Sequence, residues 1–168
     1  ATDGVEKVEL EQPRDAVTEA GGRVELLSIS DGEIDARNHD LEPAGTFTVD
    51  RLVSEAGVDE YDALVIPGGT VNGDKLRLEE AAVAFVGEFV RSGKPVAAIC
   101  HAPWTLVEAD AVRGRTLASW PSLQTDIKNA GGSWVDEEVV VDQNLITSRN
   151  PDDIPAFNSA VLDALGGR

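Results

Sequence analysis

Cysteine, methionine, aromatic residues and positive charge are all scarce in this sequence. Its 168 residues include one cysteine, Cys100, and no methionine. A single cysteine excludes a disulfide within the chain and any metal cluster of several thiolates, and it suits a reducing cytoplasm, the compartment we expect. Only 5% of the residues are aromatic although 42% are hydrophobic, so the core should consist of Val, Leu, Ile and Ala. No run of 18 apolar residues occurs, and the sequence therefore predicts no membrane-spanning helix.

The shortage of basic residues gives the chain a strong negative charge. Fourteen Lys and Arg stand against 31 Asp and Glu, for a formal net charge of −17. Such a field repels nucleic acid and anionic membranes, so neither is an expected partner. We interpret the charge as an adaptation to high salt, which screens self-repulsion. An ordinary acidic cytosolic protein is the alternative.

One α/β domain is predicted over residues 1–168, a length that suffices for its own core. Helical and strand patterns alternate, as is typical of a mostly parallel sheet flanked by helices. The expected helices are 8–20, 79–91, 102–109, 121–130 and 154–165. The expected strands are 24–29, 63–66, 95–99, 116–119, 139–141 and 145–147, the last two joined as a hairpin. Residues 36–50 are polar and rich in turn formers, which predicts a small excursion.

The predicted sheet lacks a first strand. Residues 1–4, Ala-Thr-Asp-Gly, are typical of a strand-to-helix turn, yet no strand precedes them. A doubly wound sheet normally begins with an apolar strand that becomes central. We therefore expect an apolar strand of roughly 5–12 residues upstream of Ala1.

Cys100 follows the predicted strand 95–99 directly and precedes the predicted helix 102–109. Ala98 and Ala102, two residues to either side, are small, as a tight strand-to-helix turn requires. At the start of a helix, free N–H groups favour a thiolate over a thiol. A buried, unreactive cysteine is the alternative. The small flanking residues and the adjacent His101 favour a nucleophile.

Several separated motifs resemble the DJ-1/PfpI superfamily, in particular its PfpI branch of intracellular proteases and general stress proteins. They are Val-Ile-Pro-Gly-Gly at 65–69, Ala-Ile-Cys-His-Ala-Pro at 98–103, Ser-Trp-Pro-Ser at 119–122 and Asn-Ala-Gly-Gly-Ser-Trp-Val-Asp at 129–136. The resemblance extends over nearly the whole chain. It implies a flavodoxin-like fold, a doubly wound sheet in a three-layer sandwich. It also implies a homodimer, with assembly into a hexamer as a further option.

The same resemblance implies catalytic roles for Cys100, His101 and Glu6. Cys100 would be the nucleophile, and Glu6 the acid that reaches it from the first strand-helix turn. A carboxyl beside a thiolate should have a raised pKa, so that Glu6 would be protonated and able to move a proton. A solvated glutamate at a helix start is the alternative for Glu6. His101 pairs with the cysteine in the peptidase branch, although adjacent side chains at an elbow diverge.

The remaining candidates surround this centre. Gly68 and Gly69 match the loop whose N–H groups form an oxyanion hole with the N–H of His101. Asp74 stands where the peptidase branch has a glutamate that orients the histidine across a subunit interface, and its shorter side chain weakens the case for a triad. Trp120 replaces a commoner tyrosine and narrows the pocket. Three further residues are expected to be structural: His39, Trp104 and Trp134.

Three functions stay open at this point. The first, which we expect, is an enzyme that acts on reactive carbonyls such as methylglyoxal through a hemithioacetal on Cys100. It matches the glyoxalase III and deglycase activities of the superfamily and needs no cofactor or metal ion. The second is an intracellular cysteine peptidase, with a site shared across subunits. The third is a non-catalytic stress protein that senses oxidants through a sulfinate on Cys100. An amidotransferase is the least expected, because its downstream His and Glu have no counterpart here.

Overall fold

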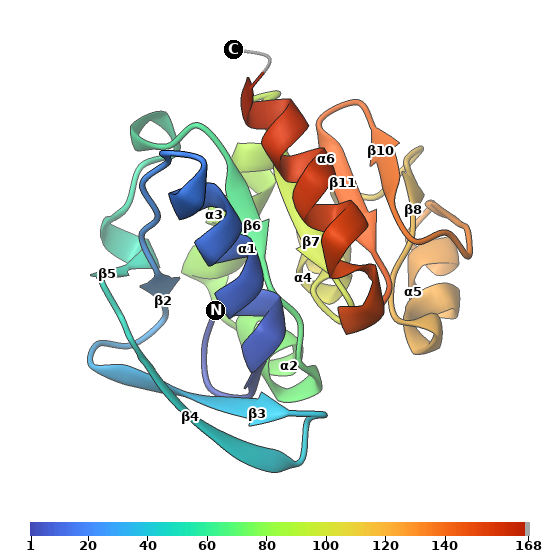
Figure 1. Cartoon of the computed structure of the whole chain (residues 1–168). Helices are drawn as coiled ribbons and strands as arrows, with labels where there is room; N and C mark the ends of the chain where they lie inside the picture. Colours follow the sequence, from blue (N-terminus) through green and yellow to red (C-terminus); the bar gives the residue numbers. More distant parts are fainter. Residues whose placement is uncertain (167–168) are drawn as a thin grey trace.

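A central sheet lies between two layers of helices in the computed structural model, which describes residues 1–166 (Figure 1). Its strands follow the order β10-β11-β7-β6. The central strand β7 (Val96–Ile99) pairs in parallel with β6 (Leu64–Ile66) and with β11 (Leu145–Ser148). At the edge, β10 (Val140–Asp142) pairs antiparallel with β11. The predicted parallel sheet flanked by helices is thus confirmed.

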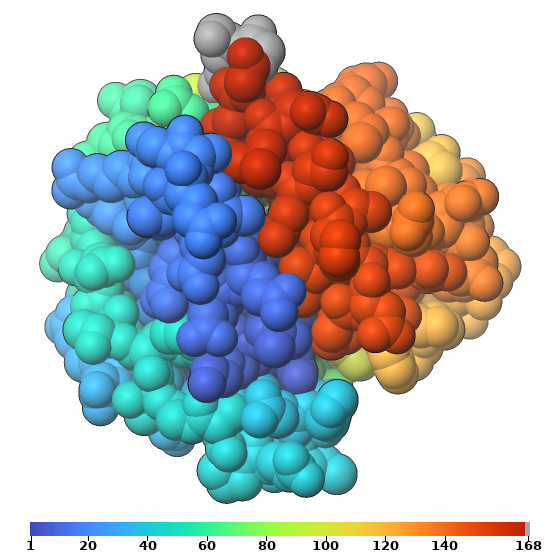
Figure 2. All heavy atoms as spheres, in the orientation of Figure 1, coloured from blue at the N-terminus to red at the C-terminus, as the bar shows by residue number. Residues whose placement is uncertain are grey.

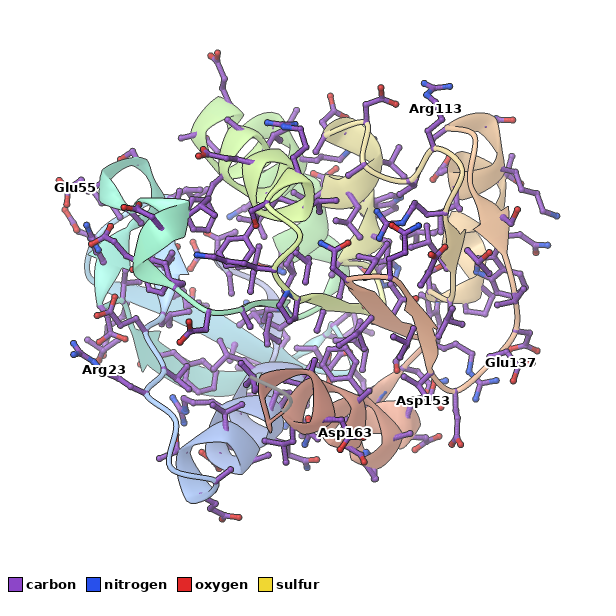
Figure 3. The ribbon with its side chains drawn as sticks, turned by 90° about the horizontal axis from the view of Figure 1, so that it is seen from above. Arg23, Glu55, Arg113, Glu137, Asp153 and Asp163 are labelled. Atoms are coloured by element: carbon purple, nitrogen blue, oxygen red, sulfur yellow. The ribbon has the colours of Figure 1, made fainter. Side chains whose placement is uncertain are left out.

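Helices cover both faces of this sheet. Figures 2 and 3 show α1 (Lys7–Glu19) and α6 (Ile154–Gly166) side by side on one face. The opposite face carries α2 (Thr70–Leu78), α3 (Glu80–Arg91), α4 (Pro103–Glu108) and α5 (Gln124–Asn129). With both faces covered, all four residues of β7 are buried, which explains its uninterrupted apolar sequence. None of the described helices has the length and apolar character needed to cross a membrane.

Short strands extend the structure beyond the central sheet. One group is β1 (Val5–Glu6), β3 (Glu33–Asn38) and β4 (Glu42–Thr48), with β1 and β3 parallel and β3 and β4 antiparallel. Two parallel pairs complete the set: β2 (Leu27–Ser28) with β5 (Arg51–Leu52), and β8 (Thr116–Leu117) with β9 (Ser133–Trp134). Four 3₁₀ turns are described at Val53–Glu55, Val58–Glu60, Pro121–Leu123 and Pro151–Asp153.

Three expectations about the elements need correction. Residues 36–50 are not a turn-rich excursion, because β3 and β4 form a hairpin that projects from the molecule (Figure 1). Ile34 and Ala36 are the buried positions of β3, an alternation that starts before residue 36. The expected strand 24–29 is reduced to β2, and α2 was not expected. The hairpin between residues 139 and 147 is confirmed.

A cavity of about 400 Å³ lies between β2 and β6, two strands that do not pair with each other. Its walls include Leu10 of α1, Phe85 and Phe89 of α3, and Leu165 of α6. The backbone nitrogen of Ala1 also lies here, 3.0 Å from the carbonyl oxygen of Leu27.

Candidate active site

Cys100 occupies a strained backbone position between β7 and α4. Its φ is 64°, in the left-handed region that residues with a side chain rarely adopt. Its N–H donates to the carbonyl of Ser148 in the neighbouring strand, and the N–H of Ala102 donates back to Ile99 at 3.1 Å, which closes the turn. The strained strand-to-helix turn expected at Cys100 is confirmed, and such strain is typical of functional sites. The nucleophilic role of Cys100 stays a prediction.

The thiol at this elbow is buried, with 7% of Cys100 exposed. Burial raises the pKa of Cys100, and ionisation of the nearby Glu9 would raise it further. The backbone N–H groups of Gly69 and His101 lie close to the sulfur and lower the pKa of Cys100, which opposes this effect. Because α4 has only six residues, its dipole adds little. The expected thiolate is therefore replaced by a thiol that needs a base to ionise.

His101 supplies a base at the sulfur. Its Nδ1 lies 3.1 Å from Sγ of Cys100, so the two side chains meet, contrary to the divergence expected for neighbours at an elbow. The imidazole is held between the rings of Trp120, stacked at 5.7 Å and 23°, and Trp104, edge-on at 5.2 Å. Burial lowers the pKa of His101, so the ring is neutral near pH 7 and can accept the thiol proton.

The buried acid beside the sulfur is Glu9 of α1. Its side chain is fully buried, and a Cβ on Gly68 would lie only 2.5 Å from its Oε1 and 2.7 Å from Cβ of Cys100. Burial raises the pKa of Glu9 well above its usual value, and the charges of Glu6 and Asp40 add to this effect. The N–H of Gly68 and the thiol face the carboxyl without reaching full hydrogen-bond geometry within the described chain. A protonated Glu9 can therefore donate to sulfur or to a substrate oxygen.

Glu6 does not occupy the place expected of it. Its carboxylate accepts hydrogen bonds from the backbone N–H groups of His39, at 2.8 Å, and Asp40, at 3.2 Å, in the turn between β3 and β4. The reason is the position in the chain, because Glu6 ends β1 before the helix begins and Glu9 lies in the first turn of α1. The assignment of Glu6 as the acid at the sulfur was wrong. A helical spacing would have pointed to Glu9, which shares the buried face of α1 with Leu10 and Pro13.

The two glycines of the expected oxyanion hole have different positions. Gly69, with φ of 101°, directs its N–H at the sulfur, together with the N–H of His101. Gly68 faces Glu9 instead, and any side chain there would collide with Glu9 and Cys100. The geometry thus brings the N–H groups of Gly69 and His101 to the reacting atom, while Gly68 provides space for the acid.

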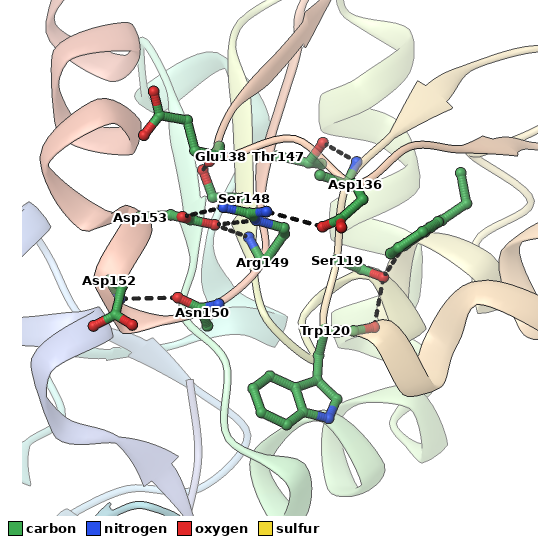
Figure 4. Close-up of polar contacts among 12 residues, drawn as sticks. Ser119, Trp120, Asp136, Glu138, Thr147, Ser148, Arg149, Asn150, Asp152 and Asp153 are labelled. Carbon is green, nitrogen blue, oxygen red and sulfur yellow. Dashed lines mark hydrogen bonds and ion pairs between the residues drawn. The ribbon is translucent and has the colours of Figure 1, made fainter.

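The expected pocket residue Trp120 closes one side of the site. Trp120 is 40% exposed, and its backbone N–H donates to the carbonyl of Cys100 at 2.9 Å. Ser119 steadies it by donating to the Trp120 carbonyl while accepting from the indole of Trp134 (Figure 4). The expected cross-subunit acid, Asp74, lies exposed on α2, so within one chain the structure does not bring it to His101.

Arg149 stabilises the end of β11, the strand that pairs with β7 beside the elbow. It follows Ser148, whose carbonyl accepts the N–H of Cys100, and it donates three hydrogen bonds of 2.9 Å to the buried Asp153 (Figure 4). A further bond of 2.8 Å joins it to Asp136. These contacts fix the end of β11 against the start of α6. No cluster of three or more His, Cys, Asp or Glu side chains in residues 1–166 is arranged to hold a metal ion.

Two residues that the sequence did not suggest complete the surroundings of His101. Thr70, the first residue of α2, places its Oγ1 3.3 Å from Nε2 of His101. The same hydroxyl donates to Oδ2 of Asp40 at 2.8 Å, and the Thr70 N–H donates to Oδ1 at 2.8 Å. Asp40 lies 61 residues before His101 in the chain, in a segment expected to be a small excursion, so no local motif pointed to it.

The family model of the DJ-1/PfpI family matches residues 1–164, which include this whole arrangement. The chain belongs to the DJ-1/PfpI family. The family assignment made from the motifs is thereby confirmed, and so is the flavodoxin-like fold.

Relatives of the DJ-1/PfpI family cover almost the entire chain. Protein/nucleic acid deglycase 2 of Escherichia coli is 41% identical over 98% of this chain and 94% of its own length. General stress protein 18 of Bacillus subtilis is 40% identical over 95% of this chain and 91% of its own. A crystal structure from Anabaena variabilis, of a protein with DJ-1/ThiJ/PfpI-like and ferritin-like domains, superposes with a TM-score of 0.93 at 37% identity. It covers 99% of this chain, which spans 46% of that two-domain protein.

Proposed function

We propose that this protein is a cofactor-independent cysteine enzyme of the deglycase kind, which acts on small reactive carbonyls and their adducts with amines. The observation that carries the proposal is the contact of 3.1 Å between the Cys100 sulfur and Nδ1 of His101, beside the fully buried Glu9. A nucleophile, a base and a neutral acid are the groups that addition to a carbonyl needs. The Escherichia coli relative is named as a deglycase, which agrees with this chemistry.

The proposed reaction begins with sulfur addition to the aldehyde carbon of methylglyoxal. His101 takes the thiol proton, the C–S bond forms as the C=O π bond breaks, and the N–H groups of Gly69 and His101 stabilise the oxyanion until it is protonated. A proton then moves from C1 to C2 through an enediol, so that C1 is oxidised and C2 reduced within one molecule. Glu9 is placed to transfer this proton. Water cleaves the resulting thioester to give lactate and free Cys100.

An amine adduct of methylglyoxal reaches the same hemithioacetal by a different first step. The sulfur displaces the amine from the carbinol carbon, so that a C–S bond forms as the C–N bond breaks. The amine leaves with a proton from the neutral acid, Glu9, or from protonated His101. From the hemithioacetal onward the two routes are identical, and no external oxidant or reductant is required.

Burial of the sulfur favours small carbonyls over peptides as substrates. Only 7% of Cys100 is exposed, and the rings of Trp120 and Trp104 flank the base beside it. An aldehyde of a few atoms needs little room to reach such a thiol, whereas a peptide must fit its backbone across it. Peptide cleavage would require a wider opening next to Trp120.

The test supplies three substrates separately, in molar salt: free methylglyoxal, its adduct with an N-acetylated lysine or arginine, and a fluorogenic peptide. We expect lactate from the first two, release of the free amine from the second, and no cleavage of the peptide. The control is Cys100→Ala, which keeps the elbow and removes the sulfur, and which should be inactive with all three. Amine must be released faster than the adduct dissociates spontaneously.

Other results would identify the remaining functions. Peptide cleavage that depends on Cys100 would replace the proposal by a cysteine peptidase. Inertness towards all substrates, combined with rapid oxidation of Cys100 by peroxide, would indicate a redox sensor.

The proposal includes an oligomer that works in a reducing, salt-rich cytoplasm. A homodimer, or a hexamer built from dimers, would bring a neighbour to the exposed side of α2 that carries Asp74. The single thiol supports the reducing compartment. The net charge of −17 supports adaptation to salt.

A further inference from the structure

A chain of hydrogen bonds leads from the sulfur to a carboxylate without leaving the subunit. It runs from Sγ of Cys100 to Nδ1 of His101 at 3.1 Å, and from Nε2 of His101 to Oγ1 of Thr70 at 3.3 Å. From there the hydroxyl reaches Oδ2 of Asp40 at 2.8 Å. The residues come from the elbow, the start of α2 and the β3–β4 turn, three parts of the chain that only the fold brings together.

The carboxylate at the end of this series of hydrogen bonds determines which atom donates in each of them. A carboxylate can only accept, so the Thr70 hydroxyl must donate its proton to Asp40. The hydroxyl oxygen is then left to accept from Nε2 of His101. A neutral imidazole with its proton on Nε2 has a free lone pair on Nδ1, the atom that faces the thiol.

We propose that Asp40, acting through the hydroxyl of Thr70, is the positioning residue that holds His101 in the Nε2–H tautomer and so directs its basic Nδ1 at Cys100. In this proposal the acid that orients His101 comes from the same chain, and a cross-subunit acid such as Asp74 is not needed for that role. Asp40 and Thr70 contact neither the sulfur nor a substrate bound to it. Their effect is exerted entirely through His101.

Glu6 holds the turn from which Asp40 acts. His39 and Asp40 both have positive φ, 54° and 65°, so the turn contains two consecutive left-handed residues that are not glycine. In that conformation their N–H groups point the same way, and both donate to the Glu6 carboxylate. Strain of this kind persists only where the surroundings fix it. Glu6 therefore stabilises the turn that presents Asp40 to Thr70.

The groups around His101 come from several elements. Asp40 from the β3–β4 turn is the charge that favours protonation of the ring, against burial. Glu9 reaches Cys100 from α1, and Arg77 of α2 lies 5.6 Å from the ring centroid of Trp104, which packs edge-on against the imidazole. Of these, only Asp40 is linked to Nε2, so its effect on the tautomer is separable from theirs.

Three variants separate the relay from a structural role. Thr70→Val removes the hydroxyl but keeps the backbone N–H that binds Asp40. Thr70→Ser keeps both groups. Asp40→Asn keeps an oxygen for the Thr70 N–H but can donate to the hydroxyl, which allows the wrong tautomer of His101. Glu42→Gln, on the exposed side of the same hairpin, is the matched control for loss of one negative charge.

The first readout is alkylation of Cys100 by iodoacetamide between pH 5 and 9. We expect Thr70→Val and Asp40→Asn to slow it about 10- to 100-fold near pH 7, in line with loss of an oriented general base. Thr70→Ser and Glu42→Gln should stay within about twofold of the parent. With methylglyoxal the same two variants should lower kcat and leave KM nearly unchanged. Circular dichroism verifies that each variant is folded.

The second readout is the tautomer itself, by ¹⁵N NMR of the imidazoles, of which the chain has two. The parent should show His101 as the Nε2–H form, and Thr70→Val should show a mixture. The proposal rests on the nucleophilic role of Cys100 but not on the substrate, because alkylation and NMR need none. It is overturned by a parent His101 in the Nδ1–H form, or by unchanged alkylation in folded Thr70→Val and Asp40→Asn. Failure of the carbonyl reaction alone overturns only the proposed function.

Discussion

Burial sets the protonation states of the three residues at the elbow. Glu9 is fully buried, His101 is 6% exposed and Cys100 is 7% exposed. Each therefore favours its neutral form, and the resting site holds a carboxylic acid, an imidazole and a thiol. Charged groups form only during the reaction, when the sulfur adds to the substrate carbon and the substrate oxygen accepts a hydrogen bond. This arrangement keeps the thiol less reactive towards stray oxidants than a free thiolate would be.

Replacing Glu9 by glutamine should raise stability at neutral pH and remove activity. Because the folded-state pKa of Glu9 is raised, its stabilising contribution is complete below the unfolded value of 4.5 and decreases as pH rises. The parent should thus lose up to about 1.4 kcal/mol of unfolding free energy per pH unit relative to Glu9→Gln above pH 5. Glutamine cannot give up a proton, so kcat should fall at least about 100-fold.

Urea unfolding of both proteins from pH 5 to 8 measures this difference. Glu19→Gln, an exposed position on the same helix, is the control and should show neither effect. A constant difference across the range would mean that Glu9 is ionised in the folded protein.

At the scale of helices and strands, local sequence patterns predicted most of the fold. The buried strand β7 and its elbow were predictable because an apolar run, a reactive residue and small neighbours follow one another directly in the sequence. The hairpin β3–β4 was not, since its polar outward residues conceal the alternation of Ile34 and Ala36. The relay residues were beyond local reasoning, because Asp40 and Thr70 meet His101 only through packing of the hairpin on α2.

Gly68 should tolerate no side chain, because it separates α1 from the elbow. A Cβ there would lie 2.5 Å from Glu9, 2.7 Å from Cys100 and 2.8 Å from the carbonyl of Ile99. Gly68→Ala should lower the unfolding free energy by about 1–3 kcal/mol and displace the acid from the sulfur, with loss of activity. Gly87→Ala in α3 is the matched control. Its nearest neighbour is a flexible arginine terminus, so helix propensity should make it neutral or stabilising by up to about 1 kcal/mol. Similar melting curves and activities for the two variants would contradict this account.

Charge acts at the scale of the whole molecule. Labelled charged side chains such as Arg23, Glu55, Glu137 and Asp163 point outward from different sides (Figure 3), and most of the ion pairs described have a partner with substantial exposure. Exposed pairs contribute little, so uncompensated repulsion among acidic groups dominates.

Salt should therefore stabilise the fold. We expect the melting midpoint, followed by circular dichroism, to be higher in molar KCl than at 50 mM, because screening reduces repulsion among the acidic groups. Charge-neutral sucrose at matched water activity controls for general exclusion effects. A midpoint that does not respond to salt would leave an acidic protein without salt adaptation.

The cavity between β2 and β6 limits the stability of the whole sheet. Strand edges face a space of about 400 Å³ whose walls include Leu64, Val65 and Phe89. Unfilled apolar volume and unpaired strand edges both cost free energy.

Joining an apolar strand to Ala1 should remove both costs. A strand buried on both faces is a nearly continuous apolar run, so about six residues rich in Val and Ile are the appropriate extension. We expect this extension to raise the melting midpoint strongly, because it fills the cavity and pairs the strand edges. A Gly-Ser extension of equal length cannot fill the cavity and should leave the midpoint nearly unchanged. Equal midpoints for the two extensions would show that the cavity does not accept a strand.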